Sequence, residues 1–275
     1  MPPIVAAGGS SAFDQIGYWS PNTASVDWCE NNYVVSFYIA EFWNTISNVA
    51  CLLAAAFGYY TFPTNERRFI LMFAAFGFVG LGSVLFHGTL QHKMQLLDEL
   101  PMLYSATIIL FILVEAKHGP QGKWFPMLLI VWIASGQLQF YSFQSTYTIL
   151  QFGMIYFIRV LHVQQRESNS APNPAITSLI RRAFFTGLFA VSIWLIDLRL
   201  CEFVNGLGAK SILKWNPQLH AWWHVFSAGA LYHAVMLIIY YHFDVRGQKP
   251  FVDYWKGYIP VIRLGLQQPK GVRQY

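Results

Sequence analysis

Three histidines stand at spacings that suit the binding of one metal ion. His220 and His224 lie four residues apart, so a helix would present both imidazoles on one face, within reach of the same cation. His87 closes an earlier apolar stretch, and Ser83 lies one helical turn before it. Three neutral nitrogen ligands leave a fourth position open for water, as in catalytic zinc sites. We therefore expect a zinc site here and interpret the other histidines as interfacial or hydrogen-bonded residues: His92, His118, His162, His233 and His242.

A carboxylate pair extends this chemistry. Asp98 and Glu99 stand where the apolar stretch after His87 begins. An ionisable side chain within or beside a membrane span is costly, and it therefore marks a candidate functional site. We expect Asp98 to lie beside the metal and to assist acid–base chemistry there.

A second group of oxygen ligands precedes the first apolar stretch. Asp27, Glu30, Asn32 and Glu41 lie close together in the sequence, and no lysine or arginine occurs in the first 66 residues. Calcium prefers such hard oxygen ligands and accepts irregular geometry. The spacing is not that of an EF-hand loop, so the residues alone leave two interpretations open. The group is either a calcium site or a helix N-terminus whose acids favour the helix dipole.

The composition places these residues in a membrane protein. Of the 275 residues, 55% are hydrophobic and only 11% are charged, whereas about a quarter of a soluble domain is charged. The basic residues flank apolar runs and form no patch interleaved with aromatic residues, which argues against nucleic-acid binding. Runs of roughly 20 apolar residues can cross a bilayer as helices. We predict an all-α bundle of seven transmembrane helices at residues 36–60, 69–90, 97–117, 123–141, 145–164, 178–198 and 217–243, the fourth being the weakest.

The distribution of positive charge predicts how this bundle is oriented. Of the 18 lysines and arginines, 14 fall on the side of the C-terminus and four on the side of the N-terminus. Because cytosolic loops carry the excess of positive charge, we predict a lumenal or extracellular N-terminus and a cytosolic C-terminus. The end of the second span and the starts of the third and seventh then meet on the non-cytosolic side. This topology brings His87, Asp98 and the two later histidines to one depth.

The predicted spans divide the chain into three parts. Residues 1–35 form a lumenal segment that lacks the basic start and apolar core of a cleaved signal peptide, so we expect it to be retained. Residues 36–243 form the transmembrane catalytic domain. Residues 244–275 form a cytosolic tail.

The cysteines agree with this topology. Cys29, before the first span, and Cys201, after the sixth, both fall on the non-cytosolic side, where disulfides persist. A bridge between them and two free thiols are both compatible with the sequence, because sequence does not establish geometry. Cys51 lies within the first span, and we expect it to be a buried apolar residue.

Long strings of the chain resemble the alkaline ceramidase family, a branch of the CREST superfamily of membrane hydrolases and related receptors. The resemblance is greatest to the third mammalian type and the fungal phytoceramidases, and no motif position departs from the pattern. It covers nearly the whole chain, through Gly17-Tyr18-Trp19, Asp27-Trp28-Cys29-Glu30, Tyr38-Ile39-Ala40-Glu41-Phe42-Trp43-Asn44-Thr45, Gly82-Ser83 to His87, Met94-Gln95-Leu96-Leu97-Asp98-Glu99-Leu100-Pro101-Met102 and Gln218-Leu219-His220-Ala221-Trp222-Trp223-His224.

The resemblance implies a function and a role for each of these residues. It implies hydrolysis of the amide bond of a ceramide, phytoceramide or dihydroceramide to a sphingoid base and a free fatty acid. Zinc would be held by His87, His220 and His224, with Ser83 and Asp98 beside it. Calcium would be held by the side chains of Asp27, Glu30, Asn32 and Glu41 and by the backbone carbonyl of Trp28. The resemblance also supports the Cys29–Cys201 bridge and residence in the endoplasmic reticulum or Golgi.

Two other classes of membrane protein are alternatives. A seven-span receptor of the adiponectin or progestin type shares the histidine–zinc framework, but such receptors have a cytosolic N-terminus, which the charge distribution argues against. A transporter would line a path across the bilayer with its ionisable residues. Here these residues gather at one end of the predicted spans.

Overall fold

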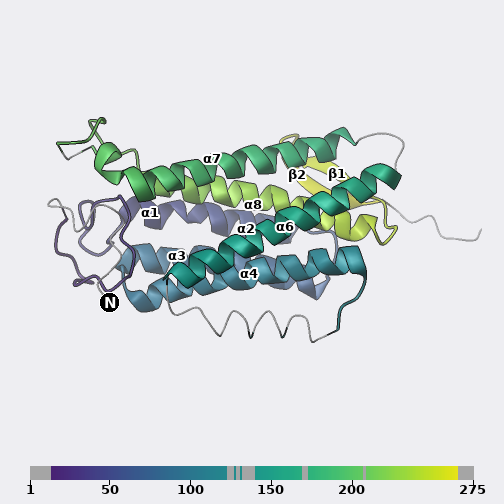
Figure 1. Cartoon of the computed structure of the whole chain (residues 1–275), viewed down its shortest axis with the longest axis horizontal. Coiled ribbons are helices and arrows are strands. Elements are labelled where there is room, and N and C mark those ends of the chain that lie inside the picture. The colour runs from purple at the N-terminus through teal and green to yellow at the C-terminus, as the bar shows by residue number, and fades with distance from the viewer. Residues whose placement is uncertain are drawn as a thin grey trace, which may run out of the picture.

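The computed structural model describes residues 14–122, 127, 131, 140–168, 173–206 and 209–265. Most of this part is helical, and the long helices run side by side along one axis (Figure 1). Seven helices and two strands are described: α1 (Phe42–Ser47), α2 (Val49–Thr61), α3 (Arg67–Thr89), α4 (His92–His118), α6 (Phe140–Ser168), α7 (Pro174–Val204), α8 (Leu219–Asp244), β1 (Pro250–Trp255) and β2 (Ile259–Leu264).

Four of these helices, α3, α4, α7 and α8, are long and apolar enough to cross a membrane. They correspond to the second, third, sixth and seventh predicted spans, and they make the chain a multi-pass membrane protein. The fifth predicted span falls within α6, which is 29 residues long but is not among these four. The fourth predicted span, 123–141, lies almost wholly outside the described residues. Seven spans and the orientation of the termini therefore stay predictions.

The first predicted span, 36–60, is wrong as a single helix. The chain is non-helical up to Glu41, with bends between residues 37 and 41, and a break at Asn48 separates the short α1 from α2. The backbone N–H groups of Ala40 and Glu41 donate to carbonyls at the end of α3, so this stretch is held by tertiary contacts. The side chain of Asn48 also donates to the backbone carbonyl of Asn44 (2.9 Å) at the break. Hydropathy does not reveal either contact.

Local sequence signals explain the start of α7. The side chain of Asn173 accepts a hydrogen bond from the backbone N–H of Ala175 (3.0 Å), and Pro174 occupies the first helical position. Both are favoured at helix N-termini, because they satisfy or remove N–H groups that have no partner within the helix. α7 continues to Val204, so Cys201 lies in the helix rather than after it.

The core surrounds α8. Nine consecutive residues of this helix, 235–243, are buried, as expected for a helix that is enclosed on all sides. Buried side chains of α3 and α4, among them Phe69 and Leu103, pack in the same cluster. By contrast, α7 exposes large apolar side chains such as Phe184 and Phe185. This outward apolar surface suits contact with lipid tails.

The predicted tail, 244–275, contains an antiparallel hairpin that the sequence analysis did not predict. Its strands pair from Pro250 with Leu264 to Trp255 with Ile259. The hydroxyl of Tyr232 in α8 donates to the carbonyl of Pro260 (2.7 Å), which anchors the hairpin against the helices. Residues 266–275 lie outside the described part.

Candidate metal centre

Three histidines meet at one end of the bundle. His87 comes from the last turn of α3, and His220 and His224 come from the first turns of α8. One ligand atom of each lies within 4.8 Å of the other two, and each residue is at most 3% exposed. His220 Nδ1 and His224 Nε2 are buried and have no hydrogen-bond partner among the described residues. Because buried polar atoms are normally paired, these nitrogens fit a metal ion.

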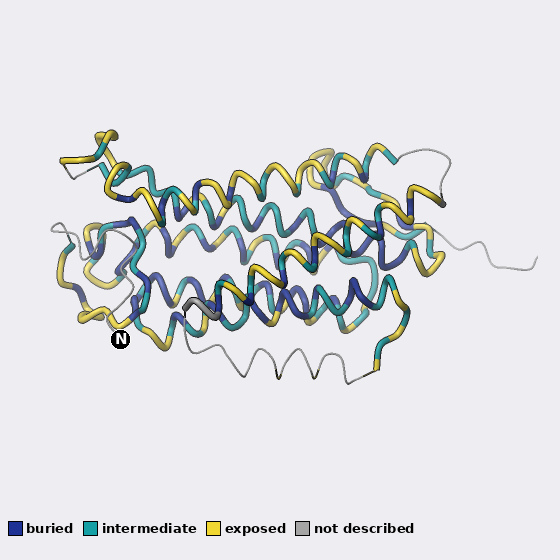
Figure 2. The backbone as a smooth tube through the Cα atoms, in the orientation of Figure 1, coloured by how far each residue is buried: buried dark blue, intermediate teal, exposed yellow. Residues whose placement is uncertain are grey.

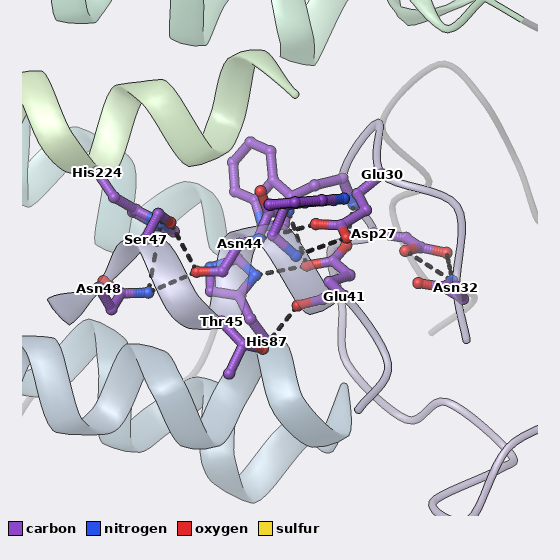
Figure 3. Close-up of polar contacts among 12 residues, drawn as sticks. Asp27, Glu30, Asn32, Glu41, Asn44, Thr45, Ser47, Asn48, His87 and His224 are labelled. Carbon is purple, nitrogen blue, oxygen red and sulfur yellow. Dashed lines mark hydrogen bonds and ion pairs between the residues drawn. The ribbon is translucent and has the colours of Figure 1, made fainter. Parts of the chain in front are cut away.

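The opposite ring nitrogens of two histidines have partners. His87 Nδ1 lies 2.5 Å from a carboxylate oxygen of Glu41. His224 Nδ1 lies 2.8 Å from the hydroxyl of Ser47 and 3.3 Å from the amide nitrogen of Asn48 (Figure 3). Metal-binding histidines usually have such partners, which fix the orientation of the ring. The arrangement therefore leaves Nε2 of both rings for a metal.

His220 is held in a different way. The indole ring of Trp28 stacks on its imidazole with a centroid distance of 3.8 Å. The carboxylate of Asp197, in α7, accepts a hydrogen bond from the backbone N–H of Cys29 (3.2 Å). Asp197 thus connects the N-terminal segment with α7.

Ser83, in α3, and Asp98, in α4, lie close enough to each other for their side chains to interact. The two helices are very close here: a Cβ atom on Gly82 would lie 1.9 Å from the backbone oxygen of Leu97. Asp98 is not a member of the three-residue group that could hold a metal.

The acidic residues of the N-terminal segment also come together. Both carboxylate oxygens of Asp27 accept from the amide of Asn32 (3.1 Å each), and Glu41 accepts from the backbone N–H of Trp28 (3.1 Å). The Asn32 amide oxygen is buried and has no partner among the described residues. Burial, with the nearby charge of Glu41, raises the pKa of Asp27 and of Glu30 to about 8. Such crowding of carboxylates fits a bound cation.

Glu30 has a further role at this place. Its two carboxylate oxygens accept from the backbone N–H groups of Trp43 (2.7 Å) and Asn44 (2.8 Å) at the start of α1. The helix-N-terminus interpretation therefore holds for this residue. A carboxylate has about four lone-pair sites, so these two bonds leave room for a cation as well.

Comparison with known proteins agrees with the sequence resemblance. A sequence model of the ceramidase family matches residues 20–263. The chain belongs to the ceramidase family. It is 30% identical to alkaline ceramidase 3 of Mus musculus over 94% of this chain and 98% of the mouse protein. It is 31% identical to alkaline ceramidase YPC1 of Saccharomyces cerevisiae (90% and 87%) and 30% identical to the alkaline ceramidase of Arabidopsis thaliana (92% and 96%).

Membership of the ceramidase family confirms the resemblance and the prediction of an enzyme. The relatives named above are ceramidases, so they do not favour the receptor alternative. The similarity covers most of this chain and most of each relative. The comparison leaves the identity of the metal and the roles of single residues open.

In this ceramidase-family chain the predicted disulfide is present. Cys29 and Cys201 are bonded, with their Cα atoms 5.4 Å apart, and they tie the N-terminal segment to the end of α7. Cys51 is free and buried, as predicted. The bridge lies beside Asp197, so covalent and hydrogen-bond connections act at the same place.

The other histidines lie outside the metal centre. As predicted, three histidines outside the centre are hydrogen-bonded: His162 to the hydroxyl of Tyr241 (2.9 Å), His233 to the carbonyl of Gly229 (2.7 Å) and His242 to the carboxylate of Glu66 (3.0 Å).

Three residues near the histidine centre were not predicted from the sequence: Ser47, Asn48 and Asp197. Asp197 carried a usable signal, because it is an acid inside a predicted span. Ser47 and Asn48 carried none.

Proposed function

We propose that this chain is a zinc-dependent amide hydrolase that cleaves a ceramide to a sphingoid base and a free fatty acid. The buried group of three histidines with unpartnered ring nitrogens, in a chain of the ceramidase family, carries the proposal. The names of the relatives supply the substrate class. Phytoceramide, dihydroceramide and unsaturated ceramide are all members of this class.

His87, His220 and His224 would hold the zinc ion, because neutral imidazoles are common zinc ligands and three of them leave one position open. When bound, zinc would supply a Lewis acid that polarises a carbonyl oxygen and lowers the pKa of water. Glu41 and Ser47 would keep two of the rings in place through their Nδ1 atoms.

Asp98 would act as the acid–base group. As water attacks the carbonyl carbon of the amide, Asp98 takes a proton from the water, and a C–O bond forms. Asp98 then gives this proton to the amide nitrogen, the C–N bond breaks, and the amine and the carboxylic acid leave. The Ser83 hydroxyl, which lies near the Asp98 carboxylate, would help to keep this carboxylate in position and to stabilise the developing oxyanion.

Calcium would bind the side chains of Asp27, Glu30, Asn32 and Glu41 and the backbone carbonyl of Trp28. The crowded carboxylates and the unpartnered amide oxygen of Asn32 support this assignment. Because Glu41 also contacts His87, bound calcium would hold the N-terminal segment against the histidines and make activity calcium-responsive.

The membrane arrangement follows the sequence prediction. The N-terminal segment (1–35) would be lumenal, residues 36–243 would form seven spans in the endoplasmic reticulum or Golgi, and the C-terminal part (244–275) would be cytosolic. The histidines lie near the ends of α3 and α8, which suits the amide of ceramide, because this group lies near the headgroup level of a bilayer. Protease protection of an N-terminal tag in sealed microsomes tests the orientation.

Ceramide hydrolysis by the purified protein tests the function. We expect His220→Ala to lose bound zinc and activity, and Asp98→Asn to keep zinc but lose activity. His233→Ala is the matched control, because His233 lies in the same helix, outside the histidine centre, where its imidazole bonds the carbonyl of Gly229. Folded His220→Ala and Asp98→Asn proteins with full activity would show that the proposal is wrong.

A further inference from the structure

The N-terminal segment exposes an apolar surface at the end of the bundle that holds the histidines. Two stretches, 16–19 and 34–38, supply it, and their large apolar side chains are between 42% and 85% exposed. Figure 2 shows the outer turns of this segment as exposed. We name this surface the aromatic face; its members are Ile16, Tyr18, Trp19, Val34, Val35, Phe37 and Tyr38.

The aromatic face has a defined structure, because its two stretches are hydrogen-bonded to each other. The backbone N–H of Tyr18 donates to the carbonyl of Phe37 (2.9 Å), and the indole N–H of Trp19 donates to the carbonyl of Tyr38 (3.0 Å). The ring of Tyr18 lies 4.9 Å from that of Trp19 and 5.7 Å from that of Tyr38. These contacts keep the apolar side chains exposed together.

The two sides of the segment differ in chemistry. Asp27, Glu30 and Asn32 lie on the inner side, toward the helices, whereas the aromatic face carries no charged residue. The chain then enters α1 and α2, where Trp43, Ile46 and Leu53 are also exposed. The aromatic face thus continues, along the chain, into the apolar surface that the helices present to lipid.

The chemistry of the aromatic face indicates what this surface contacts. A large exposed apolar patch marks an interaction site, and a water-facing loop would carry polar residues instead. Tyrosine and tryptophan are enriched where a membrane meets water, because their rings are apolar and their N–H or O–H groups find hydrogen-bond partners there. An uncharged surface needs no anionic lipid or charged partner protein.

We propose that the aromatic face inserts into the headgroup region of the bilayer and holds the catalytic end of the bundle at that depth. Lipid substrates in the same leaflet then meet the histidine centre without leaving the membrane. Only this last step rests on the proposed function, since insertion itself is independent of any reaction.

Quenching by spin-labelled lipid tests the insertion. An environment-sensitive dye is attached at Phe37→Cys, in a Cys51→Ser background that removes the free thiol, with the full-length protein in phosphatidylcholine nanodiscs. Lys210→Cys, which has an exposed side chain in the loop before α8, is the control. We expect headgroup-labelled lipid to quench the dye at position 37 several-fold more strongly than the dye at position 210. Equal, weak quenching at both positions, or a dye shielded by a second copy of the chain, overturns the proposal.

Hydrolysis of vesicle-borne ceramide tests the consequence. Phe37→Ser removes one aromatic ring that is partly immersed in the bilayer. Because this apolar contact with lipid is lost, we expect KM for vesicle-borne ceramide to rise about fivefold and kcat to stay unchanged. Hydrolysis of a short-chain ceramide dissolved as monomer should not change. Tyr258→Ser is the matched control, because Tyr258 is an exposed aromatic residue (81%, against 56% for Phe37) at the opposite end of the bundle (Figure 1). An unchanged KM for Phe37→Ser overturns the substrate step, whereas an inactive wild-type protein that still shows quenching refutes the proposed function alone.

Discussion

Replacing Gly82 by alanine tests whether the close approach of α3 and α4 positions the reacting groups. The new Cβ atom would lie 1.9 Å from the backbone oxygen of Leu97 and 3.0 Å from the backbone nitrogen of Asp98. An ordinary contact needs about 3.5 Å, so the helices must separate by roughly 1.6 Å, which is 3.5 less 1.9. The obstacle is backbone and cannot turn away like a flexible side chain.

The size of the effect follows from this displacement. Overpacking of this kind costs about 1–3 kcal/mol of unfolding free energy. Ser83 directly follows Gly82, and Asp98 directly follows Leu97, so the separation also moves the Ser83 hydroxyl away from the nearby Asp98 carboxylate. Misplacement of reacting groups by about 1 Å can lower a rate about a hundredfold. We expect Gly82→Ala to lose about two orders of magnitude in kcat and several degrees in melting temperature.

The assay compares this variant with Gly77→Ala in the same helix. A Cβ atom at Gly77 would meet only the Cβ atom of Ala55 at 3.8 Å, an ordinary contact. Alanine favours helix over glycine by about 1 kcal/mol, so this control should be as stable as the wild type or more stable. Ceramide hydrolysis and thermal unfolding are measured in the same detergent. Wild-type kcat and melting temperature for Gly82→Ala would refute the reasoning.

Three further predictions concern the supports of the histidine centre. The Cys29→Ser/Cys201→Ser variant should lose about 2–5 kcal/mol of stability, and a melting temperature like that of the wild type would contradict this. Glu41→Gln should bind zinc and calcium about tenfold more weakly; full content of both metals after dialysis, measured by mass spectrometry, would contradict it. Ser47→Ala should release zinc to a chelator at about tenfold lower chelator concentration, because His224 loses its nearest Nδ1 partner. Unchanged release would exclude the serine from this role.

The long helices could be predicted from the sequence because a chain that crosses a lipid bilayer must be helical or form a closed barrel. A chain in hydrocarbon must satisfy its backbone hydrogen bonds internally, so apolar runs of sufficient length become helices. The predicted seventh span, 217–243, accordingly differs from α8 by only one or two residues at either end. The same rule fails for 36–60, because its first residues bond the end of α3 and not one another.

The hairpin was missed although its turn had a signal. Lys256 and Gly257 both have positive φ, 49° and 81°, and a glycine between two strand-forming runs is typical of such turns. The tail was interpreted from its basic residues, which report orientation and not secondary structure. The pairing also depends on Tyr232, and no local pattern predicts that contact.

The histidine centre, too, could be predicted only in part: its ligands could be, but the residues that orient them could not. The pair of His220 and His224 follows from helical spacing, and topology adds His87 at the same depth. The contact between Ser47 and His224 joins residues 177 positions apart. Serines are frequent at many positions of helices, so neither residue type nor spacing singles out this one. Partners that orient a ligand are therefore the part of a site that sequence predicts least.

Glu41 shows that the type of a residue does not by itself reveal all of its roles. The sequence assigned it to the calcium group, and the structure also places its carboxylate on His87 Nδ1 and on the side-chain amide of Asn44. A cation and an N–H donor both favour the ionised form of a carboxylate, so these roles reinforce each other. The acidic group and the histidine centre therefore share one side chain, and a change at either must act on both.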